Sequence, residues 1–173
     1  MRDAEAVFVD AMGQFMGGYG MTPMAGRLWA WLLICEPAEQ TAAELADQLM
    51  ASRGAISGAA AFLAASGMIR RTRRRGDRRE YFSAPPGTFD AILRSIGSAY
   101  GRLSAITGEG LRAVDGAASA RSRLAEVHDA AVFIQSTFPA LIEQHLAERS
   151  ARLAAGDADA PPAPVRAARG TAA

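Results

Sequence analysis

Arginine residues concentrate in one short segment of this sequence. Seven of the ten residues from 70 to 79 are arginine, namely Arg70, Arg71, Arg73, Arg74, Arg75, Arg78 and Arg79. A guanidinium group stays positively charged at physiological pH, and its N–H donors match the oxygens of a phosphate group. A solvated charged edge that prevents pairing between sheets is the alternative role, but it needs only one or two charges. The cluster therefore favours binding to phosphates, and we expect a nucleic acid as the partner.

The net charge of +1 hides a separation of charge along the chain. Residues 1–50 contain two arginines and seven acidic residues, which gives −5. Residues 51–84 contain eight arginines and two acidic residues, which gives +6. Positive charge that gathers on one element is an electrostatic footprint of nucleic-acid binding.

The region before the arginine cluster is predicted to form two short helices. Thr41 can cap a helix, and Glu44 follows at the spacing of a capping box. Ser52 can cap a second helix. Gly67 suits the left-handed conformation just past a helix end. The segment from 41 to 67 therefore predicts a helix, a tight turn and a second helix.

After Gly67 the pattern changes from helical to alternating, which indicates strands. Ile69 and Tyr81-Phe82 have strand character, and Gly76-Asp77 between them suits a tight hairpin turn. Two helices followed by a basic hairpin are the parts of a winged helix-turn-helix. In this arrangement the second helix enters the major groove of DNA, and the hairpin, called the wing, lies along the backbone or enters the minor groove.

Several short motifs in this region carry a resemblance to a known family. They are Glu44-Leu45-Ala46, Ser52-Arg53, Ile56-Ser57, Leu63, Gly67-Met68-Ile69-Arg70-Arg71 and Gly76-Asp77-Arg78-Arg79. Together they resemble the DNA-binding domain of the MarR family. The wing sequence GDRREYFSA and the earlier segment MTPMAGRLWAWLL resemble its GbsR-like branch more closely. The resemblance implies a sequence-specific transcriptional regulator that binds double-stranded DNA as a homodimer, with a small-molecule effector pocket between the winged domain and the dimer helices.

The expected DNA contacts lie on the second helix and on the wing. Arg78 matches the family motif and is expected to reach the minor groove, while Asp77 orients a wing arginine or the turn through charge-assisted hydrogen bonds. The residues expected to neutralise phosphates are Arg73, Arg74, Arg75 and Arg79. On the second helix, Ser52 and Ser57 can bind phosphates or bases, and Arg53 can bind a guanine edge through two hydrogen bonds.

The rest of the second helix offers few side chains for reading bases. Gly54, Ala55, Gly58 and Ala61 occupy positions where relatives often carry polar residues. Specificity is then expected to depend on Arg53, on contacts of Ala55 with thymine methyl groups, and on groove width sensed by the wing. This poor set of readers supports an alternative function, a winged-helix module that docks its basic wing on an acidic partner protein.

Residues 1–40 are expected to form two helices that support the core and the dimer. The first covers about residues 3–16 and ends at Gly17-Gly18-Tyr19-Gly20, and Thr22-Pro23 starts the second. A phosphate-binding loop at the glycine-rich turn is disfavoured because no strand precedes it and no lysine follows. Candidate effector contacts, implied by the resemblance, are Phe15, Met16, Tyr19 and Trp29. Such a stripe of aromatic residues and methionine is more often plain core.

Residues 87–153 are predicted to form two long helices after the break at Pro85-Pro86-Gly87. Apolar residues recur at the helical period from Phe89 to Val114 and from Leu124 to Leu146. These two stripes exceed what a winged helix can cover, so we expect burial against a second copy of the chain. Residues 154–173 lack large apolar side chains apart from Val165 and are expected to be a disordered tail.

Composition argues against several other classes of protein. The sequence has no apolar run that could span a bilayer and no signal-peptide pattern, so a cytoplasmic protein that does not bind membranes is expected. The single Cys35 is interpreted as a small buried hydrophobe rather than a redox sensor. His128 and His145 lack the spacing of metal ligands, and no catalytic constellation is present. We therefore expect no metal, no cofactor and no enzymatic activity. The predicted fold class is mainly α with a small β-wing, flanked by dimerisation helices.

Overall fold

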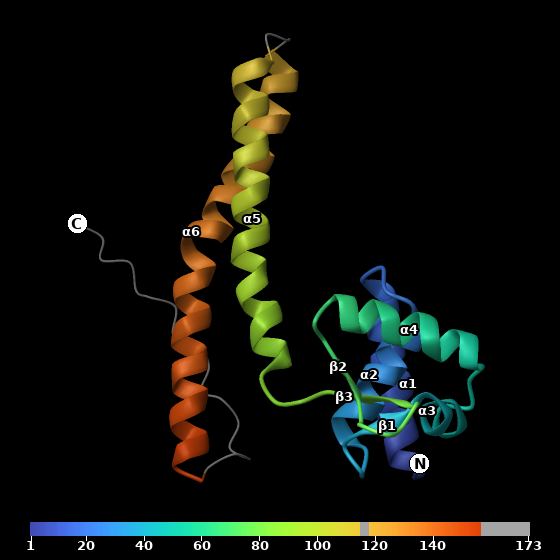
Figure 1. Cartoon of the computed structure of the whole chain (residues 1–173). Coiled ribbons are helices and arrows are strands. Elements are labelled where there is room, and N and C mark those ends of the chain that lie inside the picture. Colours follow the sequence, from blue (N-terminus) through green and yellow to red (C-terminus); the bar gives the residue numbers. More distant parts are fainter. Residues whose placement is uncertain (115–117, 157–173) are drawn as a thin grey trace. The chain divides into compact units, whose positions relative to one another are not determined.

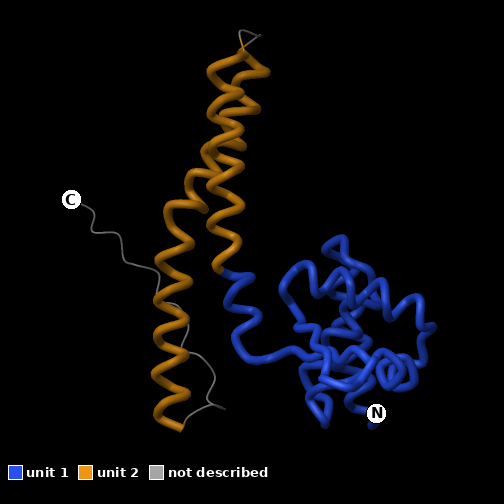
Figure 2. The backbone as a smooth tube through the Cα atoms, in the orientation of Figure 1, with its two compact units in different colours: residues 1–93 blue, residues 94–173 orange. Residues whose placement is uncertain are grey.

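The fold is mostly helical with one small antiparallel sheet, which confirms the fold class predicted from the sequence (Figure 1). The computed structural model describes residues 1–114 and 118–156. It divides into two compact units, Met1–Leu93 and Arg94–Ala173 (Figure 2). The functional division into residues 1–40, 41–84 and 87–153 stays a prediction. The predicted disordered tail lies outside the described residues from residue 157 onward.

The first two helices cross at close range. Helix α1 covers Asp3–Gly18, and α2 covers Pro23–Ile34. The predicted start of α2 is confirmed, because the backbone N–H of Ala25 donates to the Thr22 hydroxyl at 3.2 Å and proline occupies the first turn. A Cβ atom added at Gly26 would lie 2.6 Å from the carbonyl oxygen of Met12. Glycine at this position therefore allows the two backbones to touch.

The predicted helix, turn and helix are present as α3, Ala42–Gln48, and α4, Arg53–Ala65. The capping box of α3 is confirmed, since the Thr41 N–H donates to the Glu44 carboxylate at 2.6 Å and the Glu44 N–H donates back to the Thr41 hydroxyl at 3.4 Å. The Ser52 hydroxyl caps α4. Gly67 follows α4 with φ +73°, the left-handed conformation expected there.

The sheet has three antiparallel strands in the order β1-β3-β2. Strands β2, Arg70–Arg73, and β3, Glu80–Ser83, form the predicted wing hairpin. Strand β1, Gln40–Thr41, pairs with the other side of β3. The sequence does not predict β1, because a strand of two residues has no alternation to detect.

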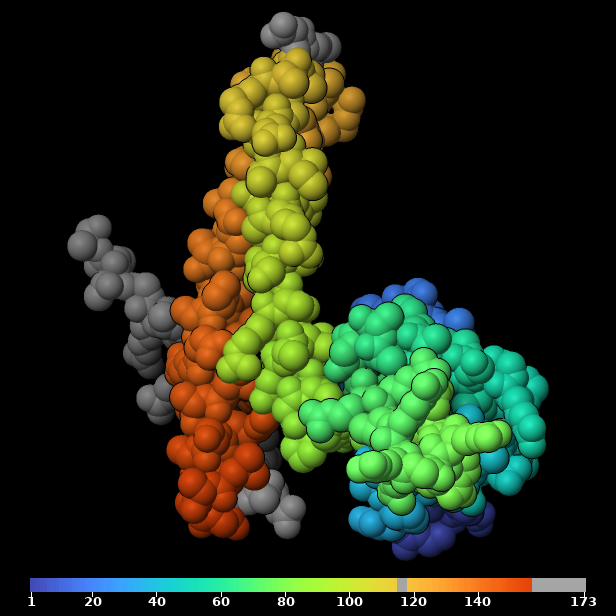
Figure 3. Space-filling model, viewed as in Figure 1, coloured from blue at the N-terminus to red at the C-terminus, as the bar shows by residue number. Residues whose placement is uncertain are grey.

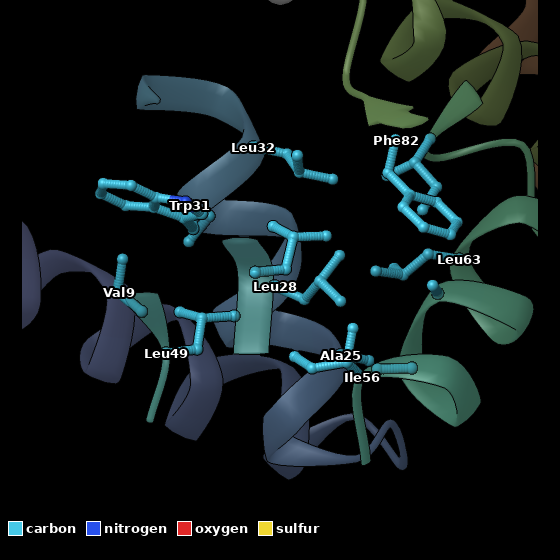
Figure 4. Close-up of a cluster of buried hydrophobic side chains, with 14 of the residues drawn as sticks. Val9, Ala25, Leu28, Trp31, Leu32, Leu49, Ile56, Leu63 and Phe82 are labelled. Carbon is cyan, nitrogen blue, oxygen red and sulfur yellow. The ribbon is translucent and has the colours of Figure 1, made fainter. Parts of the chain in front are cut away.

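The core of the first unit lies between α1, α2, α3, α4 and β3 (Figure 4). Its fully buried large side chains are Val9, Leu28, Leu45, Leu49, Ile56 and Leu63. Phe82 of β3 and Cys35 are buried in the same cluster. Burial of these side chains fixes α4 and the wing hairpin to one scaffold.

The remaining helices are α5, Thr88–Ala113, and α6, Ala118–Ala154. Small and polar residues of α5 contact α6 along much of their length. A Cβ at Gly97 would lie 2.9 Å from Cγ of Pro139. Further along, the Gln135 amide donates to the Ser104 hydroxyl at 2.9 Å, and Thr107 and His128 share a hydrogen bond of 2.9 Å. Within residues 1–114 and 118–156, no helix is long and apolar enough to cross a membrane, and no group of three His, Cys, Asp or Glu side chains is arranged to bind a metal ion.

Candidate nucleic-acid interface

The wing presents its arginines on two faces. Arg71 lies opposite Phe82 and Arg73 lies opposite Glu80, whereas Thr72 lies opposite Tyr81. Because neighbouring side chains of a strand point to opposite faces, Arg71, Arg73 and Glu80 share one face. Figure 3 shows the wing side chains projecting from the surface of the first unit.

On that face, Glu80 binds two arginines at once. Nε of Arg71 donates to Oε2 at 2.8 Å, and Nε of Arg73 donates to Oε1 at 3.0 Å. A second N–H of each guanidinium also donates to the same oxygen. These hydrogen bonds, from Arg71 and then Arg73, hold the pKa of Glu80 below its usual value. Glu80 is therefore ionised at neutral pH, and each of its carboxylate oxygens accepts hydrogen bonds from one arginine.

The turn of the wing is organised around Asp77. The backbone N–H of Arg79 donates to it at 2.9 Å, and the Arg79 guanidinium binds both carboxylate oxygens at 2.8 to 3.1 Å. The Tyr81 hydroxyl donates to the same carboxylate at 2.8 Å. Hydrogen bonds from Arg79 and Tyr81 hold the pKa of Asp77 well below its usual range, and the bond to Asp77 raises the pKa of Tyr81. The orienting contact expected of Asp77 is thus present, while its part in DNA binding stays a prediction.

A third pair links the wing to the loop before α3. Nη2 of Arg74 donates to Oε2 of Glu39 at 2.9 Å, and the Thr72 hydroxyl reaches the other oxygen at 3.4 Å. The Arg74 guanidinium also lies 4.1 Å from the centre of the Tyr81 ring, in cation–π contact. The sequence gives no signal for Glu39, because it is separated from Arg74 by 35 positions.

Four arginines of this region have no carboxylate partner among the described residues. They are Arg53 on α4 and Arg70, Arg75 and Arg78 on the wing. All four are exposed. Their charges are therefore available to an external anion.

A groove of about 500 Å³ joins α4 to the wing. It is lined by Thr41, Ala42, Ala43, Arg53, Arg71, Arg73, Arg78, Arg79 and Glu80. The fold thus brings Arg53 and Arg78 to the same concave surface, although 25 positions separate them in the sequence. Of the other expected contacts, Arg73 and Arg79 line this groove, and Arg74 and Arg75 do not.

Helix α4 exposes mostly bare backbone beside Arg53. Ser52 and Ser57 are exposed, as are Gly54 and Gly58. A Cβ atom added at either glycine would meet no atom within 4 Å. A flat surface such as the floor of a DNA groove could therefore approach the α4 backbone closely.

The four candidate effector residues have different surroundings. Met16 is buried in the core with 4% of its surface exposed, while the rings of Phe15 and Tyr19 contact each other at a tilt of 50° and are 58% and 73% exposed. Trp29 stacks on Phe89 with ring centres 5.9 Å apart. The only buried side-chain N–H of the described residues without a hydrogen-bond partner is the Trp29 indole. The effector pocket itself stays a prediction, and Met16 belongs to the core.

Comparisons with known proteins cover both parts of the chain. Residues 19–80 match the family model described as MarR family, and residues 87–148 match that of MmpR5-like MarR family transcriptional regulators. The HTH-type transcriptional regulator MmpR5 of Mycobacterium tuberculosis is 40% identical over 130 residues, which are 75% of this chain and 79% of the relative. A crystal structure described as that of a transcriptional regulator aligns with a TM-score of 0.73 and 34% identity, over 83% of this chain and 99% of the other.

Proposed function

The chain belongs to the MarR family of transcriptional regulators, and we propose that it binds a specific DNA sequence as a homodimer through α4 and the wing. This family consists of regulators rather than enzymes. The observation that carries the proposal is the groove between α4 and the wing. Arg53 and Arg78 both line it, and neither has a carboxylate partner among the described residues. In winged helices these two elements face the DNA.

Each element has a distinct part in the proposed complex. Helix α4 lies in the major groove, where Arg53 binds a guanine edge and the exposed backbone at Gly54 and Gly58 allows close approach. The wing follows the backbone, and Arg78 at its turn enters the minor groove. Specificity then combines one strong base contact with a response to groove width.

The second unit supports the proposed dimer. Helix α5 uses small and polar residues against α6, which leaves large apolar side chains exposed on both helices. They include Leu103, Ile106, Val127, Phe133, Phe138 and Leu141. Exposed apolar surface of this extent marks an interface, and burial against a second copy is its ordinary solution. Two copies would present two α4 helices to successive major grooves of a roughly palindromic site.

Finer parts of the proposal concern regulation and location. We propose that a small molecule changes the DNA affinity, and the unpartnered indole N–H of Trp29 offers one donor for it. The wing motif resembles the GbsR-like branch, whereas residues 87–148 match MmpR5-like regulators, so the branch stays open. As a regulator of transcription, the protein is expected in the cytoplasm.

A salt series with a fluorescent duplex tests DNA binding against the alternative of an acidic protein partner. We expect log K to fall linearly with log salt concentration, because bound arginines release counterions from DNA. The comparison ligand is an acidic polypeptide, polyglutamate, with the same total charge as the duplex. It has neither phosphates nor grooves. Tighter binding to polyglutamate than to any duplex would favour the protein-interaction module instead.

A further inference from the structure

The arginines of α4 and the wing fall into two sets according to their partners. The paired arginines, which bind carboxylates within the chain, are Arg71, Arg73, Arg74 and Arg79. The unpaired arginines, which have no carboxylate partner among the described residues, are Arg53, Arg70, Arg75 and Arg78. The sequence alone does not separate the two sets, because it shows only that all eight lie in one basic region.

The paired arginines make more contacts than an ordinary surface ion pair. A single exposed pair contributes little, since solvent screens it. Here Glu80 receives N–H donors from both Arg71 and Arg73, and Asp77 binds Arg79 through both carboxylate oxygens. Arg74 is held by Glu39 and by the face of the Tyr81 ring. Multiple charge-assisted donors on one carboxylate favour a fixed geometry.

The two sets differ in the net charge that they offer to DNA. The four paired arginines share three carboxylates, so together they contribute four minus three, or +1. The four unpaired arginines contribute +4. The paired arginines donate to their carboxylates through Nε and Nη2, so a DNA phosphate that approaches one of them meets the repulsion of the carboxylate beside it. An unpaired arginine has no such repulsion.

We propose that Glu39, Asp77 and Glu80 are positioning residues that keep the paired arginines from binding phosphates, so that among the arginines of α4 and the wing only the unpaired ones contribute their charge to DNA binding. This inference rests on the proposed function. It revises the expectation that Arg73, Arg74 and Arg79 bind phosphates, because these three brace the wing and thereby hold Arg75 and Arg78 at its turn.

The salt dependence of DNA binding distinguishes the two sets. Each arginine-to-alanine change removes the same charge, so a difference in slope between variants shows which arginines neutralise phosphates. The slope of log K against log salt falls by about 0.9 for every phosphate that the protein no longer neutralises. Arg75→Ala and Arg78→Ala should therefore each flatten the slope by about 1 per protomer. Arg71→Ala is the matched control and should leave the slope nearly unchanged, because Arg71 donates to Glu80. Circular dichroism checks that each variant is folded.

A second variant tests the positioning role directly. Glu80→Gln removes the charge that holds Arg71 and Arg73, so the slope should steepen by up to about 2 per protomer. Adding Arg71→Ala to Glu80→Gln should then flatten it by about 1, although Arg71→Ala alone does not. Glu80→Asp keeps the charge and should restore the wild-type slope. A merely structural role of Glu80 would weaken binding without steepening the slope.

Each outcome has a separate meaning. Equal flattening by Arg71→Ala and Arg75→Ala, or no steepening by Glu80→Gln, would overturn the division into two sets while leaving DNA binding intact. Absence of salt-dependent binding by the wild-type protein would overturn the proposed function itself.

Discussion

At the scale of single residues, the turn of the wing depends on Asp77. It accepts hydrogen bonds from the backbone and guanidinium of Arg79 and from the hydroxyl of the buried Tyr81. Tyr81 in turn supports Arg74 on its ring. One carboxylate therefore joins two residues of the wing, Arg79 and Tyr81, on either side of the turn that contains Arg78.

Replacing Asp77 by Asn should disorder this turn and weaken DNA binding, because the amide keeps the shape of the side chain but loses the charge. The folded-state pKa of Asp77 is lowered, so its contribution to stability is fully present above the unfolded value of about 3.9 and is lost as the pH falls through the lower folded value. Urea unfolding of wild type and Asp77→Asn between pH 7 and pH 2 measures this difference. It should be constant above about pH 5 and shrink below about pH 4.

Asp47→Asn is the matched control for that comparison. Asp47 is exposed on α3 and forms no ion pair among residues 1–114 and 118–156. Its substitution should leave wing order and DNA affinity unchanged. A pH-independent difference between wild type and Asp77→Asn would show that the carboxylate charge is not what holds the turn.

At the scale of elements, glycine has opposite roles in two helices. Gly26 of α2 is buried where an added Cβ would lie 2.6 Å from a backbone oxygen of α1. Gly58 of α4 is exposed where an added Cβ would meet nothing. Glycine at 26 is required by packing within the fold, whereas glycine at 58 lowers the stability of α4 without any packing reason. We therefore expect the reason for Gly58 to lie in the proposed complex with DNA.

Gly58→Ala should raise the free energy of unfolding by about 1 kcal/mol, the gain in helix propensity from glycine to alanine. It should also lower DNA affinity, because the new methyl group separates α4 from the floor of the groove. Urea unfolding and a duplex titration measure the two effects. Unchanged affinity would mean that the α4 backbone does not approach DNA at this position.

Gly26→Ala serves as the contrasting variant. Its methyl group would overlap α1, so it should lower the free energy of unfolding by about 1 to 3 kcal/mol, as overpacked cores do. If Gly26→Ala and Gly58→Ala changed stability in the same direction, the two glycines would not differ as the packing indicates.

Elements governed by local interactions could be predicted from the sequence. Thr41, Ser52 and Gly67 act on partners within a few residues, so their spacing identified the ends of α3 and α4. The pair of Glu39 with Arg74 joins positions 35 apart and becomes visible only after the hairpin folds back on the loop. The sequence therefore located the basic surface but could not tell which arginines are paired.

At the scale of the whole molecule, the distribution of apolar residues argues for a second copy. Ile106 on α5 and Phe133 on α6 are 66% and 62% exposed, and further large apolar side chains accompany them. Glycine, serine and threonine of α5 already occupy its contacts with α6. The exposed apolar side chains thus remain outside these contacts, and burial against a second copy would cover them.

Light scattering should give a mass of twice 18.2 kDa for the wild-type protein at micromolar concentration. Phe138→Glu combined with Leu141→Glu should shift this mass toward 18.2 kDa, because a buried dimer interface does not tolerate unpaired charges. Phe138→Met combined with Leu141→Met keeps both side chains apolar and of similar size, and should leave the dimer intact. A wild-type mass of one chain would contradict the proposed homodimer.

The measurement that tests the central claim most directly is selection from a pool of random-sequence duplexes at physiological salt, with sequencing of the retained DNA. Wild-type protein should enrich an inverted repeat whose halves are about one helical turn apart. Arg53→Ala should lose preference at one base pair of each half-site, while Arg75→Ala should weaken retention without changing the preferred sequence. Retention without any enriched sequence, or no retention at all, would contradict sequence-specific DNA recognition by α4 and the wing.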